Sequence, residues 1–207
     1  MSVPSIRVTS LVRVGVVVVL AVFAGACDSD STARRERPQP SRPVPSGSEV
    51  SPRWAQTMSG PSNEDEIDGV AASPDGSVYA TGKFEGTVTL GGVLLESAGA
   101  ADIPLARFDA QGQTVWAKRF GGPGEDNLFD VDANADGAVA TGAFSGTVAF
   151  GSTTLTSSGP WDCVIVALAP DGETRWARAF GGAGRDGCNE VSVRPQRGGD
   201  HVDRYAW

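Results

Sequence analysis

The sequence predicts an all-β fold built from repeated units of about 60 residues. Glycine and proline are frequent, at 27 and 13 of the 207 residues, so turns must be common. Short β-prone runs alternate with these turns, which is typical of short antiparallel strands. Closely similar segments also recur along the chain. Together these observations favour a repeat protein made of strands.

The first 26 residues have the layout of a secretory signal peptide. Arg7 and Arg13 precede an apolar run over residues 14–23, and the small residues Ala24 to Ala26 lead to Cys27. The run is shorter than the roughly 20 residues that a spanning helix needs. Ala-Gly-Ala-Cys resembles the bacterial lipobox, in which the cysteine thiol receives a diacylglyceryl group and cleavage follows on its N-terminal side.

Cys27 is therefore the predicted site of lipid attachment. The resemblance implies a protein of the bacterial cell envelope, lipid-anchored to a membrane and facing the periplasm or the exterior. Two alternatives stay open, namely cleavage without lipidation and an uncleaved anchor. Residues 27–53 contain charged residues, prolines and serines but no apolar run, so they are predicted to form a lipidated, disordered tether.

Residues 54–193 carry the internal repeat. Matching segments begin at Trp54 (WAQTMSG), Trp116 (WAKRFGG) and Trp176 (WARAFGG). The first unit is expected to contain hairpins at Asp75-Gly76, Gly91-Gly92 and Gln111-Gly112. We expect a type I′ turn at the first of these, because Asp-Gly between β-prone runs favours that turn.

The middle and end of each unit contain further shared motifs. In the first unit these are Thr81-Gly82, Phe84, Gly86-Thr87, Asp102, Gln111-Gly112, Trp116, Phe120 and Gly121-Gly122. In the second they are Thr141-Gly142, Phe144, Gly146-Thr147, Asp162, Asp171-Gly172, Trp176, Phe180 and Gly181-Gly182. This pattern resembles the bacterial seven-bladed β-propeller repeat family. The resemblance implies β-propeller-like repeats, with about two complete units and a truncated third, and no particular activity.

The chain departs from this pattern in residues 194–207, a divergent tail. The tail has no Asp-Gly turn and no Thr-Gly motif, so we hypothesise that the reading frame or gene model is broken near Arg194. Propellers usually need four or more blades to close. Two units would therefore leave open sheet edges, which invite self-association.

Cys163 and Cys188 occupy the positions that Ile103 and Leu128 hold in the preceding repeat. We therefore expect buried free thiols that act as small apolar residues, with a disulfide as the alternative. Cys163 also begins the sequence CVIVAL, which is apolar without alternation. Both faces of this predicted strand are expected to be covered.

Charge is uneven along the chain. Residues 54–207 hold 10 of the 17 basic residues but 21 of the 25 acidic ones, and such a surface repels nucleic acid. The expected partners are a membrane, through the lipid anchor, an unidentified protein or glycan ligand, and further copies of the chain.

One segment resembles the start of a calcium-binding loop. Asp130, Asp132, Asn134 and Asp136 alternate as such a loop requires, but Ala143 stands where the motif has glutamate. A plain hairpin turn is the preferred interpretation. No metal and no cofactor are predicted.

Catalysis is not expected, because His201, the only histidine, lies in the tail and leaves no triad within the repeats. The acidic pairs Glu64-Asp65 and Glu125-Asp126 recur at one repeat position, which favours a structural role. We therefore predict a surface scaffold or binding module without enzymatic activity. The alternative is a fragment of an exported quinoprotein-like propeller enzyme, since Trp116 and Trp176 follow turns as the docking tryptophan does in that family.

Overall fold

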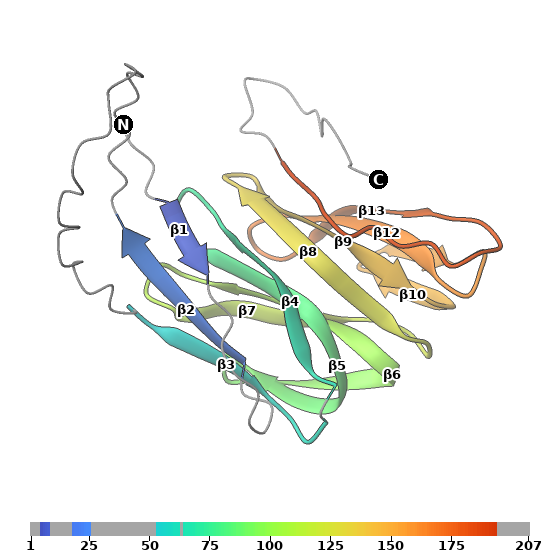
Figure 1. Ribbon diagram of the computed structural model, residues 1–207, viewed down its shortest axis with the longest axis horizontal. Coiled ribbons are helices and arrows are strands. Elements are labelled where there is room, and N and C mark those ends of the chain that lie inside the picture. Colours follow the sequence, from blue (N-terminus) through green and yellow to red (C-terminus); the bar gives the residue numbers. More distant parts are fainter. Residues whose placement is uncertain (1–4, 9–17, 26–52, 63, 194–207) are drawn as a thin grey trace, which may run out of the picture.

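The structure, a computed structural model, describes residues 5–8, 18–25, 53–62 and 64–193 of the chain (Figure 1). Every regular element in these ranges is a β-strand, which confirms the predicted all-β class. None of the described residues forms a helix long and apolar enough to cross a membrane. Cys27, the tether as far as residue 52 and the tail from residue 194 lie outside the described residues.

The first repeat unit is an antiparallel sheet of four strands in chain order. Its strands are β4 (Glu66–Ala72), β5 (Val78–Leu90), β6 (Val93–Phe108) and β7 (Thr114–Phe120). β5 and β6 are long because their far halves continue into the hairpin predicted at Gly91-Gly92. The unit is therefore a meander with a hairpin arm.

The second unit repeats this arrangement. Its sheet has the order β13-β12-β9-β8. A separate hairpin of β10 and β11 stands where the first unit has its hairpin arm. The strand bounds are β8 Asp126–Asn134, β9 Gly137–Phe144, β10 Thr147–Phe150, β11 Thr153–Thr156, β12 Asp162–Leu168 and β13 Thr174–Phe180.

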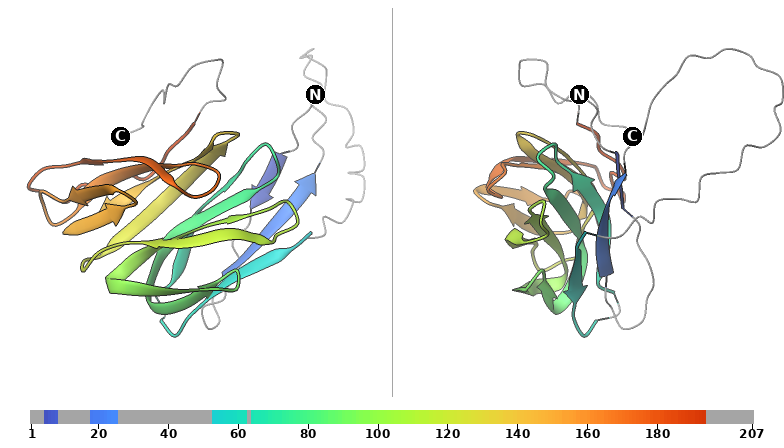
Figure 2. Two further views of the ribbon diagram at one scale, coloured as in Figure 1. Left: turned by 180° about the vertical axis from the view of Figure 1, so that it is seen from behind. Right: turned by 90° about the vertical axis from the view of Figure 1, so that its left-hand side faces the viewer.

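Three strands precede the first unit. β3 (Ala55–Ser59) pairs with the hairpin arm of β5, β2 (Val18–Gly25) pairs with β3, and β1 (Ser5–Val8) pairs with β2. Figures 1 and 2 show these strands at one end of the molecule and the second unit at the other. The apolar run predicted as an export signal thus lies partly in β2, and its cleavage stays a prediction.

The turn at Asp75-Gly76 is not type I′, and that prediction was wrong. The Gly76 N–H donates to Ser73 O at 2.9 Å, so Pro74 and Asp75 are the central turn residues. A type I′ turn needs a positive φ at both central residues, whereas proline holds φ near −65°. Gly76 follows the turn at φ +84° and closes a longer loop. The loops at Asp109–Gln113 and Ala169–Glu173 repeat these bonds.

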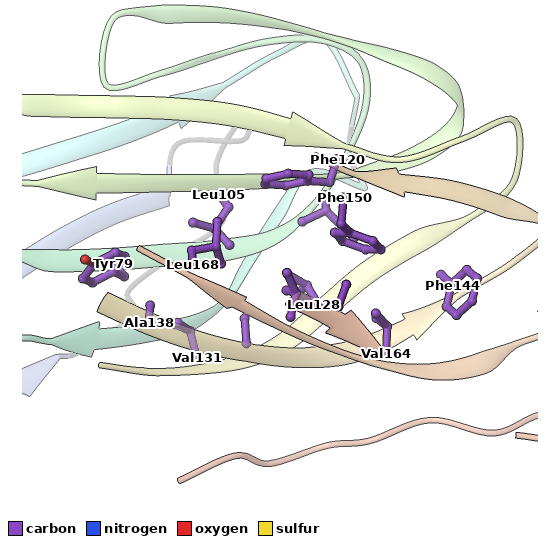
Figure 3. Packing of buried hydrophobic residues seen from close by; sticks show 14 of the residues in the cluster. Tyr79, Leu105, Phe120, Leu128, Val131, Ala138, Phe144, Phe150, Val164 and Leu168 are labelled. Carbon is purple, nitrogen blue, oxygen red and sulfur yellow. The ribbon is translucent and has the colours of Figure 1, made fainter. Parts of the chain in front are cut away.

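The main hydrophobic core lies between the two units (Figure 3). It joins Tyr79, Leu105 and Phe120 of the first unit to Phe150 and Leu168 of the second. The rings of Phe120 and Phe150 stack with centroids 5.5 Å apart. Because each fully buried large side chain contributes about 1.5–3 kcal/mol, this shared core holds the units side by side.

Both faces of β12 are covered, as the sequence predicted. All seven of its residues are buried. Val164, Val166 and Leu168 face the core between the units, whereas Cys163 and Ile165 belong to a smaller cluster on the opposite side. β12 is therefore an inner strand of its sheet that is buried on both faces.

Candidate functional site

The most distinctive local structure is a junction that joins one repeat to the next. Trp116 of β7 donates its indole N–H to Pro170 O, at 2.9 Å, in the turn of the second unit. Trp54, just before β3, makes the same contact with Ala110 O of the first unit, at 3.2 Å. The tryptophan repeat found in the sequence thus marks a repeated docking contact.

The side chain two residues after each tryptophan extends the junction. Lys118 donates from Nζ to Gly172 O at 2.7 Å, and Gln56 donates from Nε2 to Gly112 O at 2.7 Å. Lys118 also pairs with Glu173 at 2.8 Å, in an exposed contact. In each junction, the tryptophan and the side chain two residues later therefore donate to the backbone of one turn in the receiving unit.

The glycine of each receiving turn is required for two reasons. Gly112 and Gly172 both have φ of +81°, a conformation that other residues rarely adopt. A Cβ atom on Gly172 would also lie 2.8 Å from the ring of Trp116, and one on Gly112 would lie 2.5 Å from Trp54. The turn glycines thus create the flat surface on which the indole rings rest.

Arg107 strengthens the junction between the two units and was missed by the sequence analysis. It donates to Pro170 O at 2.9 Å and to Asp75 Oδ2 at 2.7 Å, and its guanidinium lies over the Tyr79 ring at 5.7 Å. Partial burial opposes ionisation of Asp75, but hydrogen bonds from Ser77 and the charge of Arg107 lower its pKa overall. The second unit has alanine at the matching position, so the repeat pattern gave no signal.

The acidic pairs of the repeat have the predicted structural role. Asp126 accepts hydrogen bonds from the backbone N–H groups of Gly122 at 2.8 Å and Ser145 at 3.2 Å, and Asp65 accepts one from Glu85 at 3.0 Å. Burial raises the pKa of Asp126 to about 6, although the two backbone donors oppose the rise. These carboxylates fasten the loop before a unit to its second strand.

A second carboxylate position fixes the irregular middle of β6 and the matching loop before β12. Asp102 is fully buried and accepts hydrogen bonds from Ala98 N at 2.8 Å and from Arg119 at 2.7 Å. Asp162 accepts one from Ser158 N at 2.9 Å in the second unit. The aspartate that the sequence placed before each hydrophobic strand is therefore a loop-fixing residue.

The suspected calcium loop has another use. Asp130 accepts a hydrogen bond from Val191 N and Asp132 accepts one from Val193 N, both at 2.8 Å. Asn134 and Gly137 pair across a tight turn, which is the plain hairpin that the sequence favoured. No cluster suited to a metal ion occurs among the described His, Cys, Asp and Glu residues. The two aspartates hold residues 191–193 against β8.

Cys163 and Cys188 form a disulfide, so the expectation of free thiols was wrong. Their Cα atoms are 5.2 Å apart, within the range that a disulfide spans. The matching residues Ile103 and Leu128 pack in one core cluster, and this closeness is what allows two cysteines there to bond. The disulfide joins the segment that follows β13 to the outer face of the second unit.

A third junction is only half formed within the described residues. Trp176 and Phe180 pack against the cluster of Cys163, Cys188 and Val191 on the outer face of the second unit. Arg178 lies 5.7 Å from the Trp176 ring, but no turn receives the indole N–H in the described part of the chain. The outer face of the second unit therefore carries the aromatic side of a junction without a receiving turn among the described residues.

The predicted lipid-attachment residue, Cys27, lies outside the described residues, as does His201. No protein-family model matches the chain. A segment of 102 residues is 29% identical to regulatory protein FlaEY of Caulobacter vibrioides, and this match covers 47% of the chain and 11% of that protein. The chain therefore matches about a tenth of the length of this curated relative.

Proposed function

We propose that the chain is an exported bacterial lipoprotein, anchored through Cys27, that displays β-propeller-like repeats as a scaffold or binding module. The anchor would hold the repeats at a membrane of the cell envelope, facing the periplasm or the exterior. The repeats would present an acidic surface to a protein or glycan ligand, and open edges would allow self-association.

The observation that carries the propeller interpretation is the repetition of one junction. Trp54 and Trp116 donate the same hydrogen bond to equivalent turns, and both sheets pair their four strands in chain order, from β4 to β7 and from β8 to β13 by way of β9 and β12. Units joined by equal contacts are rotated by equal steps, which builds a closed or curved array. Propeller blades are four-stranded sheets repeated in this way, so the repeated junction supports the proposal.

The disulfide between Cys163 and Cys188 supports the proposal of export. Disulfides persist in oxidising compartments such as the bacterial periplasm and are rare in the cytosol. A chain that carries both a lipobox-like sequence and a structural disulfide is consistent with folding outside the cytoplasm.

Lipid attachment is tested by expressing the full chain in a bacterium with a labelled fatty acid. We expect the label to appear on the wild type, with its mature N-terminus at Cys27, and to be lost in Cys27→Ser. The control is the double variant Cys163→Ser/Cys188→Ser, which should keep the label. An unlabelled wild type, cleaved elsewhere, would contradict the proposal.

The scaffold assignment is tested against the enzyme alternative by reconstitution with a quinone cofactor. With the cofactor and an alcohol or sugar as electron donor, the purified chain should reduce no more dye than the cofactor and donor do without the chain. Dye reduction that requires both the cofactor and the folded chain would contradict a scaffold role.

A further inference from the structure

β3 has the sequence and position of a fourth strand but belongs to no complete unit. In the two full units the fourth strand pairs along its length with a third strand, β7 with β6 and β13 with β12. β3 reaches the first unit through only two residue pairs, Met58 with Leu90 and Ser59 with Thr89. Its remaining edge is therefore the place where a third strand would lie.

β2 occupies that place as an antiparallel partner of β3. Val18 pairs with Met58 as Cys163 pairs with Phe180, and the pairing continues in step to Ala21 opposite Ala55. Ile103 and Phe120 form the matching pair between β6 and β7. β2 therefore lies against the edge of β3 that corresponds to the edge of β7 paired with β6 and of β13 paired with β12.

The composition of β2 suits the position. Its sequence VVLAVFAG is apolar without alternation, as is CVIVAL in β12, whose residues are buried on both faces. The neighbouring face of the first unit is apolar as well, with Val78, Phe84 and Phe108 at most 1% exposed. Met58 of β3 belongs to the same cluster. An apolar strand is thus the partner that this position fits.

We propose that β3 and this face of the first unit form a docking site for an apolar extended segment, and that Val18–Gly25 is the occupant in the uncleaved chain. Before cleavage, this segment can therefore bind either the export machinery or the sheet. Cleavage before Cys27 removes it and leaves the site vacant. The docking site is a property of the uncleaved chain. Failure of the cross-linking test would therefore not affect the fatty-acid test of lipidation, and a negative fatty-acid test would not affect docking.

The register is tested by cross-linking in the full chain, with Cys27→Ser present to prevent cleavage and to remove a competing thiol. The pair Val19→Cys and Thr57→Cys places two cysteines directly opposite each other. Opposed Cβ atoms lie about 4.5–5.5 Å apart, so a small approach of the strands brings them to the roughly 3.5–4.5 Å that a disulfide requires. The control pair Val19→Cys and Ala55→Cys is two residues out of register, at about 7–8 Å.

We expect the Val19–Thr57 cross-link within single chains, in at least tenfold excess over the control pair. Equal yields, no cross-link, or a cross-link between two chains would overturn the proposal. A second measurement uses Leu20→Pro, because proline removes a backbone donor from β2. Amide exchange in residues 55–59 should accelerate at least tenfold, and unchanged exchange would also overturn the proposal.

Discussion

Glycine at the receiving turns combines a backbone requirement with a packing requirement. At Gly172 the positive φ alone would disfavour a side chain, and the Trp116 ring occupies the space that a Cβ atom needs. The Asp-Gly signal in the sequence predicts a turn there. It does not predict the tryptophan, because the ring comes from the neighbouring unit.

Gly172→Ala should lower the free energy of unfolding by about 2–4 kcal/mol, since it adds left-handed strain and displaces the indole ring. Gly184→Ala is the matched control, because a Cβ atom there meets nothing within 4 Å and its φ is not in the left-handed range. Urea denaturation measures both. A loss for Gly172→Ala no larger than that for the control would show that the turn does not receive Trp116.

Asp126 should make the fold more stable as the pH falls from 7 towards 4. Its pKa is raised from 3.8 to about 6 in the folded state, so the native protein binds a proton that the unfolded chain does not yet bind. The stability that protonation adds is complete below pH 4 and lost as the pH rises through about 6. By pH 4 this amounts to about 2 kcal/mol.

The measurement is the difference in unfolding free energy between the wild type and Asp126→Asn across this pH range. The amide does not titrate, so the variant shows the pH dependence of the other groups. The wild type should gain about 2 kcal/mol on the variant between pH 7 and pH 4. A constant difference, or a gain in the opposite direction, would contradict a buried carboxylate of raised pKa.

Among the elements, fourth strands that carry a tryptophan provide the contacts between units. β7 and β13 have closely similar sequences and equivalent places in their sheets, yet only Trp116 meets a turn of the next unit within the described residues. The same substitution in the two strands therefore separates the junction bond from the general effect of losing an indole.

Trp116→Phe should cost about 1 kcal/mol more than Trp176→Phe. It removes the hydrogen bond to Pro170 O, whereas Trp176 has no such acceptor among the described residues. Both variants lose similar aromatic area, so the difference reports the bond. Equal losses in chemical denaturation would mean that the junction bond adds nothing to stability.

The strands and turns could be predicted from local patterns of apolar residues and turn residues. The repeat could be predicted because similar segments begin at Trp54, Trp116 and Trp176. The type I′ turn was wrong because the turn closes one residue earlier, with Pro74 and Asp75 at its centre, and the loop at Asp109–Gln113 closes in the same way with alanine in place of proline. The Cys163–Cys188 disulfide and the contacts of Arg107 depend on segments far apart in sequence. Such contacts have no local signature.

The described residues form two matching sheet units, with strands β1–β3 beside the first unit and Trp176 packed on the outer face of the second. The repeat could be predicted to build an array, but sequence alone did not show which residues join its members. The structure assigns that role to the tryptophans, the turn glycines and the shared core. The central claim is therefore that the junction makes the two units one cooperative body.

Hydrogen exchange under native conditions tests this claim most directly. The slowest amides of β5 and β6 in the first unit and of β9 and β12 in the second should open with one common free energy, because the core between the units is shared. Trp116→Ala should lower that value equally in both units. Two separate opening free energies in the wild type, with only the first unit responding to Trp116→Ala, would contradict the claim.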